Sequence, residues 1–271
     1  MTLQQQYIQN LRDIMTDMVH RVMTNPGSPW IQPPHTPLMD GYNRPFSGLS
    51  LLAVTYFRQK NRISSPFFCH AYQRKLFKQP LFKDELGVPV LKKDGEPTCV
   101  YPCNIQSNRL NDKTRRMEQN QKMLFSKMLM RMHHEKFSPI NDEGITHYIY
   151  KDITKNMPST NEMNSIIAEI SAAVVALELG LPKNIEPQNI KFLSSWNQFL
   201  HDDDIDLEFV INSVSQLVEN QSLSIRKTEI KEHVFKNNLT DKIRNLATDC
   251  KGYIPRVKTL SEMFTPSIKI K

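Results

Sequence analysis

The segment between residues 25 and 46 constrains the fold of this chain more than any other. Prolines recur through it, and they fix the backbone while removing amide donors, so neither a helix nor a central strand can cross it. It includes the string Pro29-Trp30-Ile31-Gln32-Pro33-Pro34. A tryptophan fixed between prolines is typical of a surface that stacks bases or grips a partner, and the alternative is a structural plug.

Regular patterns lie on both sides of this loop. Residues 3–24 have apolar positions spaced for one face of a helix. Residues 49–57 are again mainly apolar. Two short runs, residues 88–91 and 98–101, flank an Asp94-Gly95 pair. Two β-rich runs around such a pair predict an antiparallel hairpin.

The rest of the chain is predicted to be mainly helical. Residues 108–137 form a basic, methionine-rich segment, and Ser159 to Glu162 fit a capping box for a helix that ends at Gly180. Another helix is expected over residues 187–199, and a third after Asp203 and Asp204, whose carboxylates would cap it.

We therefore expect an α+β protein, with a mixed N-terminal domain that has a small antiparallel sheet, followed by a mainly helical domain. Segments near residues 225–235 and 239–247 are expected to continue the helical bundle. The predicted divisions are a domain over residues 1–106, a connector over 107–137, a helical domain over 138–252 and a surface tail over 253–271.

Composition excludes several classes of protein. Hydrophobic residues make up 39% of the chain, and no apolar run approaches the ~20 residues of a membrane helix, so no membrane insertion is expected. The N-terminus has no signal-peptide pattern. The four cysteines (Cys69, Cys99, Cys103 and Cys250) are too few for a disulfide scaffold and indicate reduced thiols in a cytoplasmic protein.

Charge is distributed unevenly along the chain. The first 155 residues carry 22 Lys and Arg against 13 Asp and Glu, whereas the remainder carries 13 against 15. A basic first half joined to a near-neutral second half indicates an anionic partner for the first half. The alternative is a basic surface that binds nothing.

The order of these motifs resembles the ArdC-type antirestriction family. An amphipathic helix precedes Pro29-Trp30-Ile31-Gln32-Pro33, and a turn over residues 42–50 (YNRPFSGLS) leads into an apolar segment. In this chain Asn43 replaces the first glycine of the family's turn, Phe46 replaces a tyrosine and Ser50 an asparagine. The resemblance, which covers roughly residues 5–104, implies a single-stranded-DNA-binding module of a plasmid or other mobile element.

The second half resembles the zincin-like peptidase domain of the same family more faintly, through residues 164–173, Leu179-Gly180 and 195–200. A zincin needs two histidines one helical turn apart with a glutamate beside the first. The nearest string is His134-Glu135-Lys136-Phe137-Ser138, and of the downstream glutamates Glu169 remains. We therefore expect no catalytic residues, no bound metal and no cofactor.

Cys99 and Cys103, with Cys69 and His70, could supply zinc ligands. The alternative, which the spacing favours, is that these are strand cysteines in the core.

The predicted function is non-catalytic binding of single-stranded DNA, in antirestriction or conjugative transfer. One alternative is a protein-interaction factor that inhibits or recruits a conjugation or restriction protein, and another is a zinc-dependent hydrolase. Phe46 is also a candidate for the core. The candidate DNA-binding residues are Trp30, Tyr42, Arg44, Phe46, Arg58, Arg62, Arg74, Lys75, Lys92 and Lys93.

Overall fold

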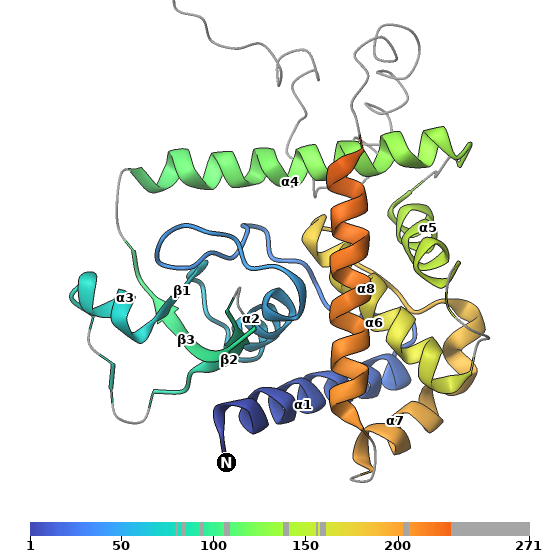
Figure 1. The fold of residues 1–271 in the computed structure, drawn as a ribbon, viewed down its shortest axis with the longest axis horizontal. Helices are drawn as coiled ribbons and strands as arrows, with labels where there is room; N and C mark the ends of the chain where they lie inside the picture. Colours follow the sequence, from blue (N-terminus) through green and yellow to red (C-terminus); the bar gives the residue numbers. More distant parts are fainter. Residues whose placement is uncertain are drawn as a thin grey trace, which may run out of the picture.

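The computed structural model describes residues 1–79, 81–82, 85–92, 95–105, 109–137, 141–155, 157, 161–202 and 206–228. It confirms the α+β class (Figure 1). The strands are β1 (Phe67–His70), β2 (Val88–Leu91) and β3 (Pro97–Cys103). The helices are α1 (Leu3–Thr24), α2 (Gly48–Lys60), α3 (Ala71–Leu76), α4 (Arg109–His134), α5 (Asp142–Thr154), α6 (Glu162–Glu178), the 3₁₀ helix η1 (Pro187–Phe192), α7 (Leu193–His201) and α8 (Leu207–Lys227).

The three strands form one antiparallel sheet in the order β1-β3-β2. The predicted hairpin is confirmed, with Val88 opposite Val100. On the other edge of β3, Phe67 lies opposite Cys103. The four-residue strand β1 was not predicted, because so short a run cannot be distinguished from a loop by alternation alone.

Helix α1 has the predicted bounds. The side chains of Thr2 and Gln5 form a capping box at its start, and Asn25 ends it. Its buried face packs against α7, α8 and α2, so the N-terminal helix joins the helices of the second half (Figure 1). In this view the sheet lies on one side of α8, helices α5 to α7 lie on the other, and α4 crosses the top.

The main hydrophobic core is continuous across the two halves of the chain. One cluster of buried side chains draws on α1, α2 and the sheet as well as on α4 to α8. Helix α6 is at its centre, because every residue from Ser165 to Leu177 is buried. A helix that is apolar on all sides is covered on all sides. Described side chains from both halves of the chain therefore belong to one core.

Several details of the helical half differ from the predictions. Asn161, which accepts a hydrogen bond from the Asn164 amide, caps α6, whereas Ser159 lies outside the described residues. Asp206 caps α8, whereas Asp203 and Asp204 lie outside the described residues. The helix predicted over 187–199 is a 3₁₀ turn followed by α7, and α5 was not predicted.

Residues 229–271, which include the predicted tail, also lie outside the described part. Among the described helices, none has the length and hydropathy needed to span a membrane.

Candidate nucleic-acid interface

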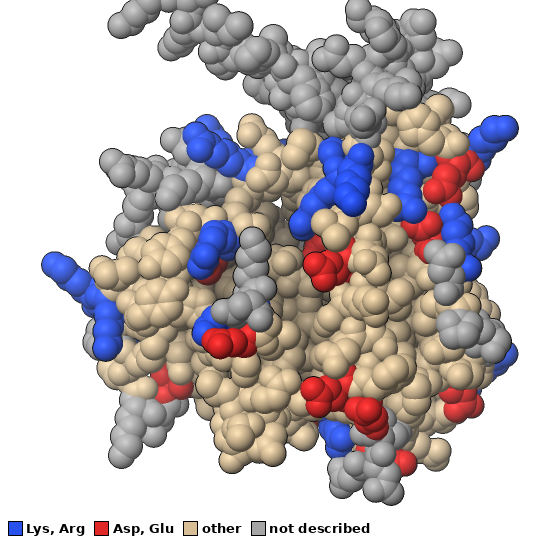
Figure 2. Space-filling model, in the orientation of Figure 1, with Lys and Arg blue, Asp and Glu red and all other residues tan. Residues whose placement is uncertain are grey.

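A groove of about 880 Å³ opens between the start of α2, the sheet and α8. Figure 2 shows the molecule hollowed between the sheet side and α8, with both Lys or Arg and Asp or Glu side chains around the hollow. Its lining residues come from five separate stretches of the chain. They are Tyr7, Arg44, Pro45, Phe46, Ser47, Leu49, Ser50, His70, Tyr72, Leu91, Lys92 and Ser215.

A tight turn over residues 40–44 presents Arg44 to the groove and Tyr42 beside it. The buried carboxylate of Asp40 accepts hydrogen bonds from the backbone amides of Tyr42, at 2.8 Å, and Arg44, at 2.9 Å. It also binds the Arg44 guanidinium through Nε at 2.7 Å and Nη2 at 2.6 Å. Asn43 has a φ of +62°, which confirms that asparagine can take the left-handed conformation here.

The turn packs closely against the sheet and α3, and Gly41 makes this possible. A Cβ atom at Gly41 would lie 3.1 Å from Cys69 Sγ, 3.0 Å from the Phe77 ring and 3.1 Å from Gln73 Cβ. These neighbours are core atoms with little room to move. The turn is further tied to β1 by a backbone hydrogen bond from Phe68 to Met39.

Aromatic side chains from the turn, β1 and α3 form a partly exposed cluster. The His70 and Tyr72 rings stack with centroids 5.4 Å apart and planes 6° apart. The Tyr42 ring is 6.3 Å from Tyr72, and the Arg44 guanidinium lies over Tyr42 at 5.2 Å. Tyr42 and Tyr72 are 50% and 53% exposed. We call His70, Tyr72, Tyr42 and Arg44 the aromatic platform.

The groove is lined by basic groups without acidic ones. Arg44, whose side chain is 65% exposed, and Lys92 contribute positive charge, and no Asp or Glu is among the described lining residues. Each cation is held by an acid outside the lining, Arg44 by Asp40 and Lys92 by Glu96. The hydrogen bond that Arg44 donates to the Asp40 carboxylate raises the pKa of Arg44, so this side chain stays charged.

The platform also contains a titratable ring. Partial burial lowers the pKa of His70 below its ordinary value. The Nδ1 atom of His70 lies 3.4 Å from Thr98 Oγ1 on the neighbouring strand β3. His70 is therefore neutral at neutral pH and can gain charge when the solution becomes acidic.

Some candidates from the sequence meet at this groove and others do not. Arg44, Phe46 and Lys92 line it, and Tyr42 lies beside it in the platform. Phe46 also packs against the core, as its alternative assignment expected. The candidates that do not line the groove are Arg58 and Arg62, which lie at and just after the far end of α2, and Lys75, which is exposed on α3. Lys93 lies outside the described residues.

Two predicted DNA contacts are corrected by their burial. Trp30 is fully buried, its ring packs 6.1 Å from Trp196, and its Nε1 donates to Glu169 at 3.2 Å. It is the structural plug and does not stack on bases. Arg74 is also buried and forms an ion pair with Glu85, so it has no free surface for a phosphate.

Tyr7, His70 and Tyr72 line the groove but were not predicted to do so. Tyr7 belongs to the apolar face of α1, and nothing in that pattern separates it from an ordinary core residue. His70 and Tyr72 follow one another across the junction of β1 and α3. A histidine and a tyrosine beside a strand end were a possible signal, but their stacking depends on the unpredicted strand.

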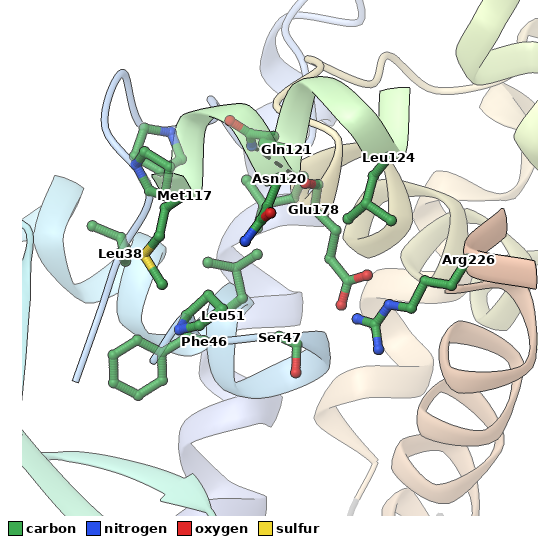
Figure 3. A pocket seen from close by; sticks show the side chains of 14 residues that line it. Leu38, Phe46, Ser47, Leu51, Met117, Asn120, Gln121, Leu124, Glu178 and Arg226 are labelled. Carbon is green, nitrogen blue, oxygen red and sulfur yellow. Dashed lines mark hydrogen bonds between the residues drawn. The ribbon is translucent and has the colours of Figure 1, made fainter. Parts of the chain in front are cut away.

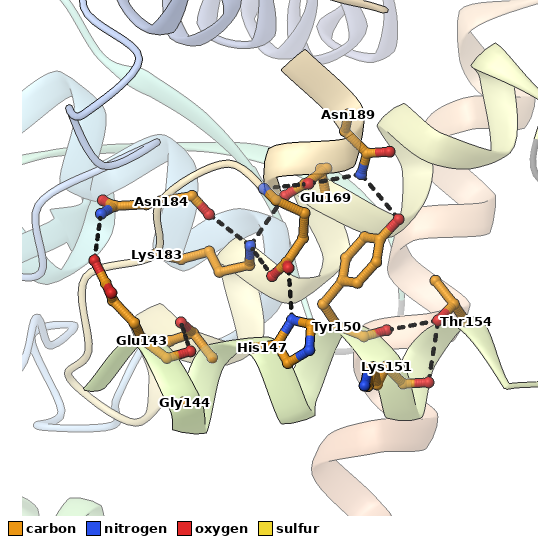
Figure 4. Close-up of polar contacts among 12 residues, drawn as sticks. Glu143, Gly144, His147, Tyr150, Lys151, Thr154, Glu169, Lys183, Asn184 and Asn189 are labelled. Atoms are coloured by element: carbon orange, nitrogen blue, oxygen red, sulfur yellow. Dashed lines mark hydrogen bonds and ion pairs between the residues drawn. The ribbon is translucent and has the colours of Figure 1, made fainter. Parts of the chain in front are cut away.

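A second polar cluster lies inside the helical half (Figure 4). The Lys183 ammonium lies 3.1 Å from the Glu169 carboxylate and 2.9 Å from that of Glu186, and all three side chains are buried. His147 Nδ1 lies 2.6 Å from Glu186, and the amide of Asn189 donates to Glu169 at 2.8 Å. The sequence analysis had noted only Glu169 here, although the apolar spacing of residues 145–153 could have revealed α5, which carries His147.

This cluster does not fit a metal ion as it stands. The Lys183 ammonium already supplies the positive charge between the two carboxylates. Among the described residues there is no group of three or more His, Cys, Asp or Glu side chains arranged to hold a metal. Helix α4 ends at His134 and Lys136 has a φ of +58°, so the residues after His134 leave the helix, and Ser138 lies outside the described residues.

A smaller cavity of about 100 Å³ lies between α4, α6 and the proline-rich loop (Figure 3). Its lining is mainly apolar, with Leu38, Leu51 and Leu124 among its side chains. Both oxygens of the Glu178 carboxylate at its edge accept hydrogen bonds, one from the backbone amide of Gly48 at 2.8 Å and one from the Ser222 hydroxyl at 2.6 Å. This contact fixes the start of α2, and thereby the floor of the groove.

No model of a known protein family matches the sequence, and no curated protein matches it. Two solved structures of the antirestriction protein ArdC from plasmid R388 are similar to this chain. The Mn(II)-bound structure aligns with a TM-score of 0.48 and 10% identity, over 79% of this chain and 97% of that one. The metal-free structure aligns with a TM-score of 0.45 and 12% identity, over 80% and 100% of the two chains.

Proposed function

We propose that this protein binds single-stranded DNA in the groove, without catalysing a reaction on it. The observation that carries the proposal is the aromatic platform, whose exposed Tyr42 and Tyr72 rings stand beside Arg44 at the edge of a groove lined by basic residues. Exposed aromatic rings are unfavourable in water unless something covers them, and stacked bases do so without regard to sequence.

The charges of the groove suit a strand rather than an uncharged partner. A single strand combines phosphates, which Arg44 and Lys92 can contact, with flat bases, which the Tyr72 and His70 rings can stack on. The basic first half of the chain adds long-range attraction to such a strand. The setting, antirestriction or conjugative DNA transfer by a mobile element, belongs to the proposal through the motif resemblance described above.

Loss of either platform tyrosine should weaken this binding. We expect Tyr42→Ala and Tyr72→Ala each to reduce affinity for a labelled single-stranded oligonucleotide about tenfold, because stacking of one base is worth ~1–3 kcal/mol. Fluorescence anisotropy with single- and double-stranded oligonucleotides would measure the change. Phe209→Ala is the matched control, since Phe209 is 52% exposed on α8 but does not line the groove.

Salt dependence separates this function from protein binding. Affinity should fall as salt rises, and Lys92→Ala should reduce the slope of log affinity against log salt by about 0.7, the value for one phosphate contact on a single strand. Lys151→Ala, on an exposed position of α5, should leave the slope unchanged. If the wild type binds no oligonucleotide at low salt, the proposal is wrong, and a protein partner becomes the better candidate.

Acidification should strengthen binding through His70. Because burial lowers the pKa of His70 in the free protein, the ring is neutral at pH 7, and a nearby phosphate would favour its charged form. The complex would then bind more protons than the free protein, so affinity should rise as pH falls between about pH 8 and pH 5. Anisotropy titrations across this range would measure the rise, and His70→Gln should remove it. A pH profile that is the same in both proteins would exclude this role of His70.

A further inference from the structure

The turn beside the groove is built on an acidic residue, although a polyanion is the ligand proposed for the groove. Asp40 is 5% exposed, and each oxygen of its carboxylate binds a different group. Oδ1 accepts from the backbone amides of Tyr42 and Arg44, whereas Oδ2 holds the Arg44 guanidinium. Asp40 therefore does two separable things: one oxygen shapes the turn, and the other fixes a cation at the groove.

The contact with Asp40 uses only one side of the guanidinium. A guanidinium has five N–H donors in a rigid plane. Asp40 Oδ2 lies 2.7 Å from Arg44 Nε and 2.6 Å from Nη2, and the Tyr42 ring lies against one face of the group at 5.2 Å. The donors on Nη1 are not used by Asp40. Arg44 can thus keep its ion pair while it donates to a phosphate, as a planar, forked group allows.

Holding Arg44 in one place has an effect on binding that opposes the effect of the acidic charge. An arginine side chain that is 65% exposed would otherwise lose much rotamer freedom when it contacts a ligand. The ion pair removes this freedom before the strand arrives, which favours binding. The charge of Asp40 disfavours binding, but salt screens charges in solvent over about 8 Å at physiological ionic strength. Ordering of Arg44 should therefore outweigh repulsion under these conditions.

From this arrangement we propose that Asp40 is a positioning residue for DNA binding, which strengthens the binding of a polyanion by fixing the Arg44 guanidinium for contact with a phosphate. This inference rests on the proposed function. The other acid paired with a groove cation differs in kind. Glu96 has a side chain that is 67% exposed, and it pairs with the compact ammonium of Lys92 at 2.7 Å. A phosphate would compete with Glu96 for Lys92, whereas it would add to the contact that Asp40 makes.

The replacement Asp40→Asn separates position from charge. The Asn side-chain oxygen can still accept from the turn amides, but its NH₂ group cannot accept from the guanidinium. At about 0.15 M salt, we expect affinity for a labelled single-stranded oligonucleotide to fall about fivefold, the effect of having to order one long side chain. Glu96→Gln is the matched control, because it removes the same charge from an exposed acid. Its affinity should be equal to or above that of the wild type.

A double-mutant cycle shows whether Asp40 acts through Arg44. In the Arg44→Ala background, Asp40→Asn should cause no further loss of affinity, because the side chain that it positions is gone. Arg44→Lys is a second, independent variant at an exposed side chain. It keeps the charge but lacks the planar fork that can bind Asp40 and a phosphate together, so its affinity should be about as low as that of Arg44→Ala.

The outcomes separate this inference from the proposed function. Asp40→Asn binding as tightly as the wild type or more tightly, or losing as much affinity without Arg44 as with it, would overturn the role of Asp40 while the wild type still bound DNA. Wild-type affinity of Arg44→Lys would also overturn it, and this result decides if Asp40→Asn does not fold. No binding by the wild type would overturn both proposals.

Discussion

Replacing Trp30 with alanine is expected to lower the free energy of unfolding by about 3–5 kcal/mol, the usual cost of truncating a buried aromatic side chain. The ring is fully buried against Trp196, and its Nε1 donates to the buried Glu169 carboxylate. Its backbone amide also donates to the Lys183 carbonyl at 2.8 Å. Trp30 therefore joins the proline-rich loop to the helical half, and chemical denaturation would measure its contribution.

Two further variants make this expectation specific. Trp30→Phe keeps most of the ring but loses the hydrogen bond to Glu169, so its loss of stability should be smaller than that of Trp30→Ala. Tyr42→Ala, which truncates an exposed ring, should be nearly neutral for stability. If Trp30→Ala were as stable as the wild type but bound single-stranded DNA more weakly, the original base-stacking prediction would be right and the structural role wrong.

Replacing Lys183 with methionine is expected to lower the free energy of unfolding by about 3–5 kcal/mol, because it removes one partner of a buried ionic cluster. The Lys183 ammonium lies between the buried carboxylates of Glu169 and Glu186. Methionine fills a similar volume but leaves both carboxylates without their counter-charge. Denaturation in urea would measure the loss, and Lys151→Met, on the exposed face of α5, should change stability little.

A second substitution should restore part of this stability. In the Lys183→Met background, Glu186→Gln removes one of the two uncompensated charges, so the double variant should be more stable than Lys183→Met alone. A double variant that loses the sum of the two single effects would show that the carboxylates do not depend on Lys183. The same variants retain the groove residues, so their affinity for single-stranded DNA should match the wild type wherever they are folded.

The candidate site was predicted in part. The turn residues Tyr42 and Arg44 and the hairpin residue Lys92 stand out because turn side chains project. The structure places Arg44 and Lys92 in the lining of one groove and Tyr42 beside it. Trp30 looked equally suited to stacking, yet it is buried. Its ring is buried against Trp196 and hydrogen-bonded to Glu169. These residues are more than 130 positions away, and no local pattern connects them with Trp30.

Local chemistry determined the elements of this protein. Apolar spacing set the bounds of α1, the Asp-Gly turn set the β2–β3 hairpin, and Gly180, with a φ of +77°, marked the end of α6. Each of these depends on interactions within a few residues, which the sequence displays directly. Asn43, with its left-handed backbone, belongs to the same class.

Only the tertiary structure decided which side chains meet. The stacking of His70 on Tyr72, the approach of Tyr42 and the burial of Tyr7 depend on how the helices pack around the sheet. The same packing placed Lys183 between two glutamates and Trp30 against Trp196. Burial and long-range pairing are properties of the whole core, so they follow from the packed chain and not from any segment of it.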